Sequence, residues 1–231
     1  MIGSAQKLLM ARAGVQKGIP IGIETTGLTL YVDAGIPESY SGTGTSWYDI
    51  SGNGHVGTLN GNPTYTTSVG GEINFDGIGD FISFSTYQSP ADDATTSFTW
   101  NIWSYRIGTT HNPTMGIRFT PSLNDFAKLN EDGRFEWYPN PAITPSSAPV
   151  STWNNICIVK DGTSFTYYLN GSVVGSTTNT QVKPQRNFFL GGDPGGEYST
   201  SIISNAAVYN VALSPTQVAS NFEALRGRYG I

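Results

Sequence analysis

Short stretches of alternating hydrophobic and polar residues, separated by turn residues, run along most of this chain. The clearest set lies at Trp153–Lys160, Ser164–Leu169 and Ser172–Ser176, separated by Asp161-Gly162 and Asn170-Gly171. Both dipeptides suit tight hairpin turns, because Gly, Asn and Asp accept the positive φ that such turns need. The pattern therefore predicts a three-stranded antiparallel meander.

Similar stretches predict further strands before and after the meander. In Ser97–Arg106 the residues Phe98, Trp100 and Ile102 alternate with Thr99, Asn101 and Trp103, which predicts a half-buried strand. Other short strands are expected at Leu28–Ala34, His55–Leu59, Glu72–Phe75, Asp80–Phe84, Met115–Phe119, Phe126–Leu129, Arg134–Trp137, Phe188–Leu190 and Ile202–Tyr209. Many short strands with turn signals between them indicate an all-β sandwich or jelly roll.

One helix is expected, near the C-terminus. The segment Ser214–Gln217 is a capping box with proline at the first helical position. The apolar stripe that follows consists of Val218, Phe222 and Leu225. We expect this stripe to pack on the sandwich and Gly227 to end the helix.

Residues 1–26 differ from the rest of the chain and are interpreted as an N-terminal arm outside a single domain of residues 27–231. The run Ala5–Val15 suits a short helix, and Gly18–Thr26 suits no regular element. Two interpretations stay open: a disordered terminus, or a docking segment for a partner. The apolar residues of the docking segment are Leu8, Leu9, Met10, Ile19, Ile21 and Ile23.

Composition narrows the function classes. The 231 residues carry a formal net charge of −5, with 12 Lys and Arg spread thinly, so no basic stripe is present to bind nucleic acid. Neither a signal peptide nor a transmembrane run is recognisable, and we therefore expect synthesis in a cytoplasm and no membrane partner. The single cysteine, Cys157, lies in an apolar run and is expected to be a small buried hydrophobic residue.

Four sequence blocks resemble a known family. The spacing W-x-x-I-x-x-V-x-D-G followed by Y-x-N-G, from Trp153 to Gly171, resembles laminin-G-like domains of the concanavalin A-like lectin/glucanase superfamily. Residues 28–61, 73–84 and 207–231 resemble laminin-G-like domains of tailed-bacteriophage virion proteins. The blocks span nearly all of the domain, and the resemblance implies an antiparallel jelly-roll β-sandwich with one C-terminal helix.

The same resemblance implies a function. It points to a non-enzymatic bacteriophage virion structural protein, such as a decoration, collar or tail-associated protein, whose lectin-like domain is displayed on the particle. The expected partners are other virion proteins, reached through the arm, further copies of the chain in the particle, and a host surface glycan. A free-standing carbohydrate-binding module and a glucanase remain as alternatives.

Hydrolytic chemistry has little support in the sequence. Glycoside hydrolysis needs two carboxylates that flank the scissile bond, and the E-x-D-x-x-E or E-x-D-x-E pattern of the family's hydrolases does not occur. The nearest cluster is Glu131, Asp132 and Glu136, where Asp132-Gly133 is better interpreted as a hairpin turn. The two histidines, His55 and His111, accompany no nucleophile motif. We therefore expect no catalytic residues.

Calcium is the one cofactor that the resemblance suggests, since many members bind this ion at the rim of the sandwich. The candidate ligands are Asp33, Asn53 and Asp80, with Asp76 more distant. Calcium-binding relatives often carry an acidic residue where this chain has Ser204-Asn205. The favoured interpretation is that Asp76 and Asp80 shape a turn, so that no metal or other cofactor is expected.

A glycan site would use exposed aromatic side chains as stacking platforms, together with a few polar groups. The candidates are Trp103, Trp137 and Tyr138, and Tyr105 and Tyr198 belong to the same wider set. With 5 Trp, 12 Tyr and 11 Phe in the chain, most aromatic side chains must be buried. The sequence alone does not choose among them.

Overall fold

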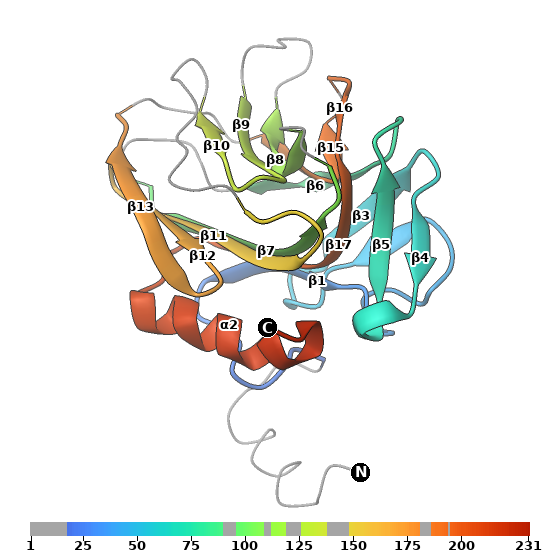
Figure 1. The fold of residues 1–231 in the computed structure, drawn as a ribbon, viewed down its shortest axis with the longest axis horizontal. Coiled ribbons are helices and arrows are strands. Elements are labelled where there is room, and N and C mark those ends of the chain that lie inside the picture. The colour runs from blue at the N-terminus through green and yellow to red at the C-terminus, as the bar shows by residue number, and fades with distance from the viewer. Residues whose placement is uncertain are drawn as a thin grey trace, which may run out of the picture.

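In the computed structural model of this chain, two antiparallel sheets pack face to face (Figure 1). The structure describes residues 18–89, 96–108, 112–118, 126–137, 148–180, 186–193 and 195–231. In spatial order sheet A consists of β13 (Ser172–Thr178), β12 (Ser164–Leu169), β11 (Trp153–Asp161), β7 (Phe98–Arg106), β17 (Thr200–Tyr209), β5 (Glu72–Asp76) and β4 (Thr64–Thr66). The first strand, β1 (Leu28–Asp33), pairs with β17 beside β5.

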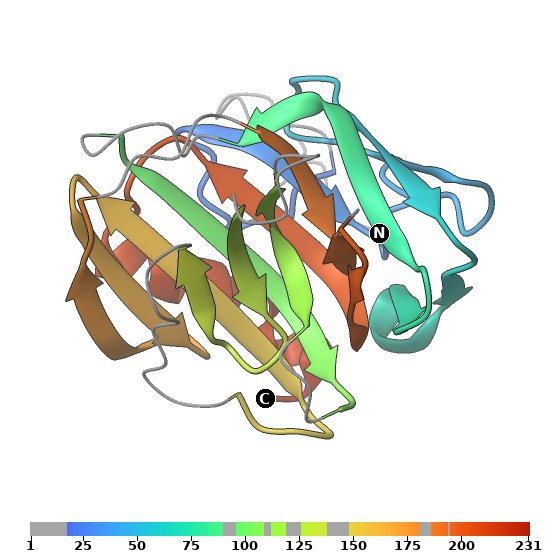
Figure 2. The ribbon, with the colours of Figure 1, turned by 90° about the horizontal axis from the view of Figure 1, so that it is seen from above.

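Sheet B lies over sheet A (Figure 2) and has seven strands. They are, in spatial order, β10 (Phe135–Trp137), β9 (Phe126–Asn130), β8 (Pro113–Arg118), β14 (Arg186–Leu190), β6 (Phe81–Ser89), β3 (Val56–Asn60) and β2 (Ser46–Tyr48). A two-stranded hairpin, β15 (Gly192–Asp193) and β16 (Glu197–Tyr198), stands above sheet B, and α2 (Pro215–Tyr229) lies under sheet A (Figure 1). A short 3₁₀ turn, η1, covers Ser68–Gly70. The predicted all-β sandwich with one C-terminal helix is confirmed.

The meander predicted from the two turn dipeptides is present as β11, β12 and β13. Asn170 and Gly171 have φ of 50° and 74°, which is the backbone geometry that a tight hairpin turn requires. The strands pair antiparallel, with Ile156 opposite Leu169 and Leu169 opposite Ser172. β13 continues to Thr178, two residues beyond the predicted end.

The main core fills the space between the sheets. Alternate residues of each strand point into it, as the period of a strand requires. Trp100 on β7 packs there with Phe135 and Phe188 of sheet B, at ring-centroid distances of 5.9 Å in both pairs. Because Phe98, Trp100 and Ile102 all point inward, the opposite face of β7 is free to receive the helix.

The prediction that β7 is half-buried is wrong, because α2 covers its outer face. Trp103 is fully buried and stacks on Phe222 and on Tyr229, with ring centroids 5.6 and 4.1 Å away. A second apolar layer therefore exists between sheet A and the helix. Residue alternation reveals which side chains share a face, but it does not reveal that both faces are covered.

The helix begins as predicted and ends later. Ser214 Oγ accepts a hydrogen bond from the Gln217 amide, and Gln217 Oε1 accepts one from the Ser214 amide, so the capping box is confirmed. Gly227 does not end the helix, which continues to Tyr229 and is capped by Gly230 with φ of 72°. The residues beyond Gly227 include Tyr229, which is buried against Trp103. No helix in the described ranges is long and apolar enough to cross a membrane.

Residues 18–26 pack against the domain, which corrects the proposed arm of residues 1–26. Ile19 is only 3% exposed and Ile23 is half-buried, so the chain itself covers both side chains. The Glu24 amide donates to Asn221 Oδ1 at 2.7 Å, and Gln217 Nε2 donates to the Glu24 carboxylate at 2.8 Å. Of the three predicted docking residues that the structure describes, Ile19, Ile21 and Ile23, only Ile21 is exposed, at 65%. Leu8, Leu9 and Met10 lie outside the described residues.

Candidate functional site

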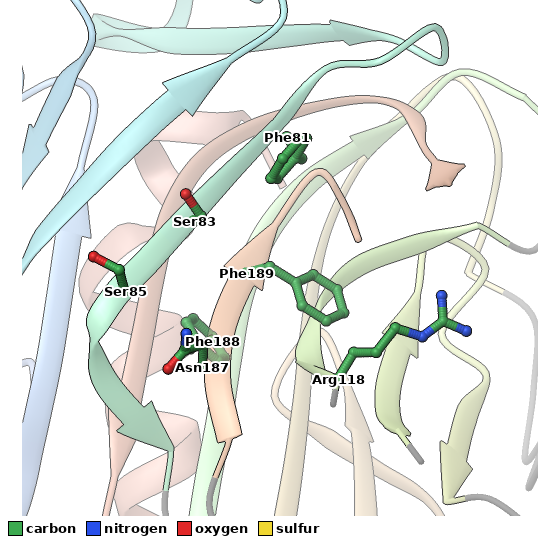
Figure 3. A pocket seen from close by; sticks show the side chains of 7 residues that line it. All are labelled: Phe81, Ser83, Ser85, Arg118, Asn187, Phe188 and Phe189. Atoms are coloured by element: carbon green, nitrogen blue, oxygen red, sulfur yellow. The ribbon is translucent and has the colours of Figure 1, made fainter. Parts of the chain in front are cut away.

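The outer face of sheet B carries a hollow of about 310 Å³, which we call the sheet B pocket. Its lining consists of Phe81, Ser83, Ser85, Arg118, Asn187, Phe188 and Phe189 (Figure 3). Three of these residues come from β6, three from β14 and one from β8. Strand periodicity explains the arrangement: Ile82 and Phe84 point into the core, so their neighbours along β6 point outward.

The pocket combines apolar and polar groups. Phe81 is half-buried, whereas Phe189 is buried and only 2% exposed. Ser85 and Asn187 are exposed, and their side chains make no hydrogen bond to any described residue. Ser83 Oγ accepts a hydrogen bond from Asn60 Nδ2 at 3.0 Å. The free hydroxyl and the free amide are therefore the groups available to a ligand.

The β15–β16 hairpin is held over the same face of sheet B by charge pairs. Arg118 Nη1 lies 2.5 Å from Asp193 Oδ1 and 3.3 Å from Glu197 Oε2. Lys128 Nζ, from β9, lies 2.5 Å from Glu197 Oε2. The ring of Tyr198 approaches Phe81 with centroids 6.2 Å apart. The hairpin thus stands beside the pocket and contributes an aromatic side chain next to Phe81.

Burial and neighbouring charges shift the pKa values of the two hairpin carboxyls, Asp193 and Glu197, in opposite directions. Burial raises the pKa of Asp193 above its ordinary value, and the Glu197 carboxyl adds to the rise, while the Arg118 guanidinium opposes it. Burial also acts to raise the pKa of Glu197, but the hydrogen bond and positive charge of Lys128 outweigh it, and that pKa is lowered. Glu197 is therefore the carboxylate that holds its charge longest on acidification.

The cations beside the pocket are compensated by acids. Arg118 and Lys128 face Asp193 and Glu197, and Glu136 Oε2 lies 3.7 Å from Lys128 Nζ. Ionised, these two cations and three carboxylates sum to a charge of −1. The cluster therefore has no excess positive charge with which to attract an acidic ligand.

Most of the predicted aromatic candidates that the structure describes are not accessible to a ligand. Trp103 and Trp137 are both fully buried, the first under α2 and the second in the core between the sheets, so neither offers a face to a sugar. Tyr138 lies outside the described residues. Tyr105 packs against Trp153 under sheet A. Of the two wider candidates, Tyr198 lies next to Phe81 but does not itself line the sheet B pocket.

Sequence reasoning missed the two phenylalanines of the pocket that point away from the core, Phe81 and Phe189. In the run Phe81-Ile82-Ser83-Phe84, strict alternation puts Phe81 on the face opposite Phe84. On β14 the same argument separates Phe189 from Phe188. The period alone contained this signal, but it did not say which face is solvent-exposed.

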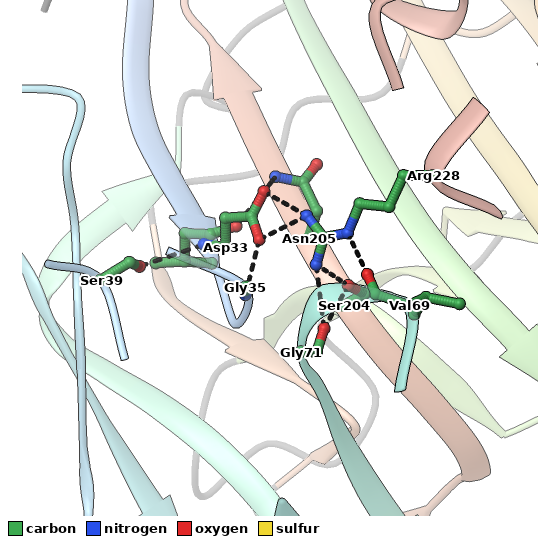
Figure 4. Close-up of polar contacts among 9 residues, drawn as sticks. Asp33, Gly35, Ser39, Val69, Gly71, Ser204, Asn205 and Arg228 are labelled. Carbon is green, nitrogen blue, oxygen red and sulfur yellow. Dashed lines mark hydrogen bonds and ion pairs between the residues drawn. The ribbon is translucent and has the colours of Figure 1, made fainter. Parts of the chain in front are cut away.

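The predicted calcium ligands are occupied by the protein's own groups. Asp33 is fully buried, and its two carboxylate oxygens accept hydrogen bonds from Arg228 Nη1 at 2.7 and 2.8 Å (Figure 4). The Gly35 amide also donates to Asp33, at 2.8 Å, and Asn205 Nδ2 lies 3.5 Å away. A guanidinium therefore compensates the Asp33 carboxylate.

The other calcium candidates do not join Asp33. Asn53 Nδ2 donates to backbone carbonyls of β1 and to Ser51 Oγ. Asp80 accepts from the amides of Asn62 and Asp76, at 2.7 and 3.3 Å, and so shapes the turn between β5 and β6. Within the described residues, no three His, Cys, Asp or Glu side chains lie together in a way that could hold a metal ion.

The groups considered for hydrolysis have structural roles. Gly133 has φ of 81°, and Asp132 Oδ1 accepts from the Arg134 amide, which confirms the turn at Asp132-Gly133. His55 packs on Tyr87 with ring centroids 4.7 Å apart, and His111 lies outside the described residues. Cys157 is buried, as predicted.

Comparison with known proteins agrees with this geometry. Residues 76–219 match the model of a family described as the concanavalin A-like lectin/glucanases superfamily. No curated protein matches the sequence. Among solved structures, domain 4 of AbnA, a GH43 extracellular arabinanase from Geobacillus stearothermophilus, in complex with arabinotriose, is similar with a TM-score of 0.66 and 21% identity, over 87% of this chain and 100% of that domain.

Two other solved structures illustrate the range of similar proteins. Trypanosoma rangeli sialidase in complex with sialic acid gives a TM-score of 0.65 at 17% identity, over 96% of this chain and 39% of that one. The binding domain of botulinum neurotoxin serotype G gives 0.60 at 15% identity, over 84% of this chain and 50% of that one. The chain spans between 32% and 39% of the sialidase chains. At these identities the similarity shows a shared fold.

Proposed function

Because this chain belongs to the concanavalin A-like lectin/glucanases superfamily, we propose that it is a non-enzymatic carbohydrate-binding domain whose site is the sheet B pocket. One observation carries the proposal: the half-buried Phe81 lies beside a free hydroxyl and a free amide in one hollow. Sugars present apolar C–H faces and hydroxyl edges, and small-ligand pockets match these with apolar side chains and a few polar groups.

The charge of the cluster indicates the class of glycan. Asp193 already binds the Arg118 guanidinium, and Glu197 already binds Lys128. An acidic sugar would have to displace these carboxylates, whereas a neutral sugar would not. We therefore assign the pocket to neutral glycans.

The carboxyl pair of the hairpin does not support catalysis. Carboxyls with separated pKa values are a feature of glycosidase sites. Here Asp193 is fully buried behind Arg118, so that its carboxyl cannot reach a glycosidic bond in the pocket. Binding without cleavage is the function that this arrangement supports.

A titration of the ¹⁵N-labelled chain with neutral oligosaccharides tests the proposal, with arabinotriose as the first probe because a similar domain is known in complex with it. Backbone amides of β6 and β14 should shift, and chromatography should recover the probe uncleaved. Asn187→Ala should weaken binding about fivefold or more, since a typical hydrogen bond contributes about 1 kcal/mol. Phe81→Ala should weaken it as well.

A matched control uses another exposed asparagine. Asn210 follows β17 and does not line the pocket, so Asn210→Ala should bind like the wild type. Equal losses in the Asn187 and Asn210 variants, or amide shifts confined to other faces across a panel of neutral glycans, would remove the pocket from consideration.

The setting proposed for this domain is a bacteriophage virion, where it would be a structural component that displays the glycan site. Support for this setting comes from the resemblance of residues 28–61, 73–84 and 207–231 to virion proteins. Association with other virion proteins and with further copies of the chain belongs to the same proposal. Mass spectrometry of purified particles should detect the chain at a fixed copy number, and its absence from the particles would contradict the proposal.

A further inference from the structure

A second hollow, of about 440 Å³, lies at the β4–β5 edge of sheet A. We call it the rim hollow; its polar lining consists of Asn62, Thr64, Asn74, Asp76, Asp80 and Thr200. These residues come from β4, β5, the start of β17 and the turns beside them, on the side of the molecule away from β13 (Figure 1). Phe75 and Ile107 supply its apolar part.

The rim hollow is distinct from the sheet B pocket. Ile73 and Phe75 point into the core between the sheets. Asn74 and Asp76 therefore point outward from sheet A, whereas the sheet B pocket opens from the other sheet. The two hollows share no lining residue.

Four neutral polar side chains in the rim hollow have unused hydrogen-bonding capacity. Those of Asn62, Thr64, Asn74 and Thr200 make no hydrogen bond to any described residue. Two amides and two hydroxyls around one hollow offer both donors and acceptors. This set matches the hydroxyl edges of a sugar.

The charge of the rim hollow is negative. Asp80 is buried, and both of its carboxylate oxygens accept backbone hydrogen bonds. Asp76 is exposed; its Oδ1 accepts from the Ile78 amide at 2.7 Å, which leaves Oδ2 for a ligand. No Lys, Arg or His belongs to the described lining of the hollow. The hollow therefore favours a cationic group and disfavours an acidic one.

We propose that the rim hollow is a second ligand site, which takes a sugar unit bearing an amino group. Asp76 Oδ2 would accept from the ammonium group, the amides and hydroxyls would bind the sugar hydroxyls, and Ile107 would cover an apolar face. The ligand class rests on the proposed carbohydrate-binding function, but the site and its charge preference are independent of the sheet B pocket.

Three tetrasaccharides of equal length test the charge preference: β-1,4-linked glucosamine, its fully N-acetylated form, and galacturonate. Each is titrated into the ¹⁵N-labelled full chain. Glucosamine tetrasaccharide should shift the amides of residues 62–64, 74–76 and 200, with binding about tenfold or more tighter than that of the N-acetylated form, as a charge-assisted hydrogen bond implies. Galacturonate should leave these amides unshifted. Equal shifts with all three would overturn the proposal.

A charge-neutralising variant isolates Asp76. In Asp76→Asn the amide oxygen still accepts from the Ile78 amide, so the turn is kept while the charge is lost. Binding of the glucosamine probe should fall about tenfold, to the level of the N-acetylated probe. Asp161→Asn is the matched control, because this exposed carboxylate lies beyond the opposite end of β7 from Ile107. Equal losses in both variants would show a non-specific charge effect and refute the site.

The outcomes separate this inference from the proposed function. If neutral glycans shift β6 and β14 but glucosamine leaves the rim amides unshifted, the rim site is wrong and the sheet B pocket stands. If glucosamine shifts the rim amides and no neutral glycan shifts β6 or β14, the rim site stands and the sheet B pocket is wrong.

Discussion

Arg228 connects three parts of the fold through one side chain. From the last turn of α2 it binds Asp33 at the end of β1, and its guanidinium also donates to Gly71 O and to Ser204 Oγ. Asp33 is fully buried, so its charge depends on this partner. Burial acts to lower the pKa of Arg228, but the neighbouring Tyr229 and Asp33 outweigh this effect, and that pKa is raised.

Replacing Arg228 should therefore cost much more than breaking a surface ion pair. In Arg228→Met the buried Asp33 carboxylate loses its counter-charge, and we expect a loss of about 3 kcal/mol in the free energy of unfolding. Glu223→Gln breaks the exposed pair with Arg226 and should cost about 0.5 kcal/mol or less. Urea denaturation measures both. A cost for Arg228→Met as small as that of the control would show that Asp33 is solvated.

At the level of elements, α2 continues beyond Gly227, where the sequence predicted its end. Gly227 lies inside the helix with open space around its α-carbon, whereas Gly230 sits at the C-terminal cap with φ of 72°. Adding a side chain should therefore have opposite effects at these two positions. A side chain at residue 227 only reduces the freedom of the unfolded chain, while one at residue 230 must adopt a left-handed conformation.

We accordingly expect Gly227→Ala to stabilise the protein by roughly 0.5–1 kcal/mol, the usual difference between Gly and Ala within a helix. Gly230→Ala should destabilise it by about 1 kcal/mol, because the left-handed backbone is unfavourable for alanine. Thermal melts followed by circular dichroism compare the two variants with the wild type. Destabilisation by Gly227→Ala would indicate that the helix ends at residue 226.

At the level of the whole molecule, the central strands of sheet A, β11, β7 and β17, are covered on both faces. The inner face packs against sheet B and the outer face against α2 and residues 18–26. Cys157 lies in this layer, on β11 between β7 and β12, and is fully buried. Burial raises the pKa of its thiol to about 12, from an ordinary value of 9.0.

The thiol should consequently report global unfolding. Ellman's reagent should not react with the native protein, and the free energy obtained from labelling should equal that from urea denaturation. The raised pKa also makes folding stability depend on pH. Because the thiol of the unfolded chain ionises at a lower pH than the buried thiol, this group lowers folding stability as the pH rises from 9.0 toward about 12. A Cys157→Ala variant should lack the part of that slope between pH 9.0 and 10.0, because above the ordinary tyrosine pKa of 10.0 the buried Tyr87 and Tyr209 lower stability in the same way. Rapid labelling in native buffer would contradict the coverage of sheet A.

Much of the fold follows from local sequence signals. The turns at Asp161-Gly162 and Asn170-Gly171 and the capping box at Ser214 involve residues within a few positions of one another. Their physical causes are the φ preferences of Gly and Asn and the hydrogen bonds of a helix end, and both act over short sequence distances. Strand alternation likewise determined which residues share a face.

The proposed binding surface was decided by tertiary structure. Trp103 is covered because α2, more than a hundred residues later, stacks Phe222 on it, whereas the pocket side of β6 leaves Phe81 open. Asp33 is matched by Arg228, 195 positions away. Whether a side chain belongs to the core, forms a buried ion pair or is exposed to a ligand depends on which distant element packs against it. Local sequence determined the strands, their turns and the helix start, and long-range packing determined which of their faces remain available to a ligand.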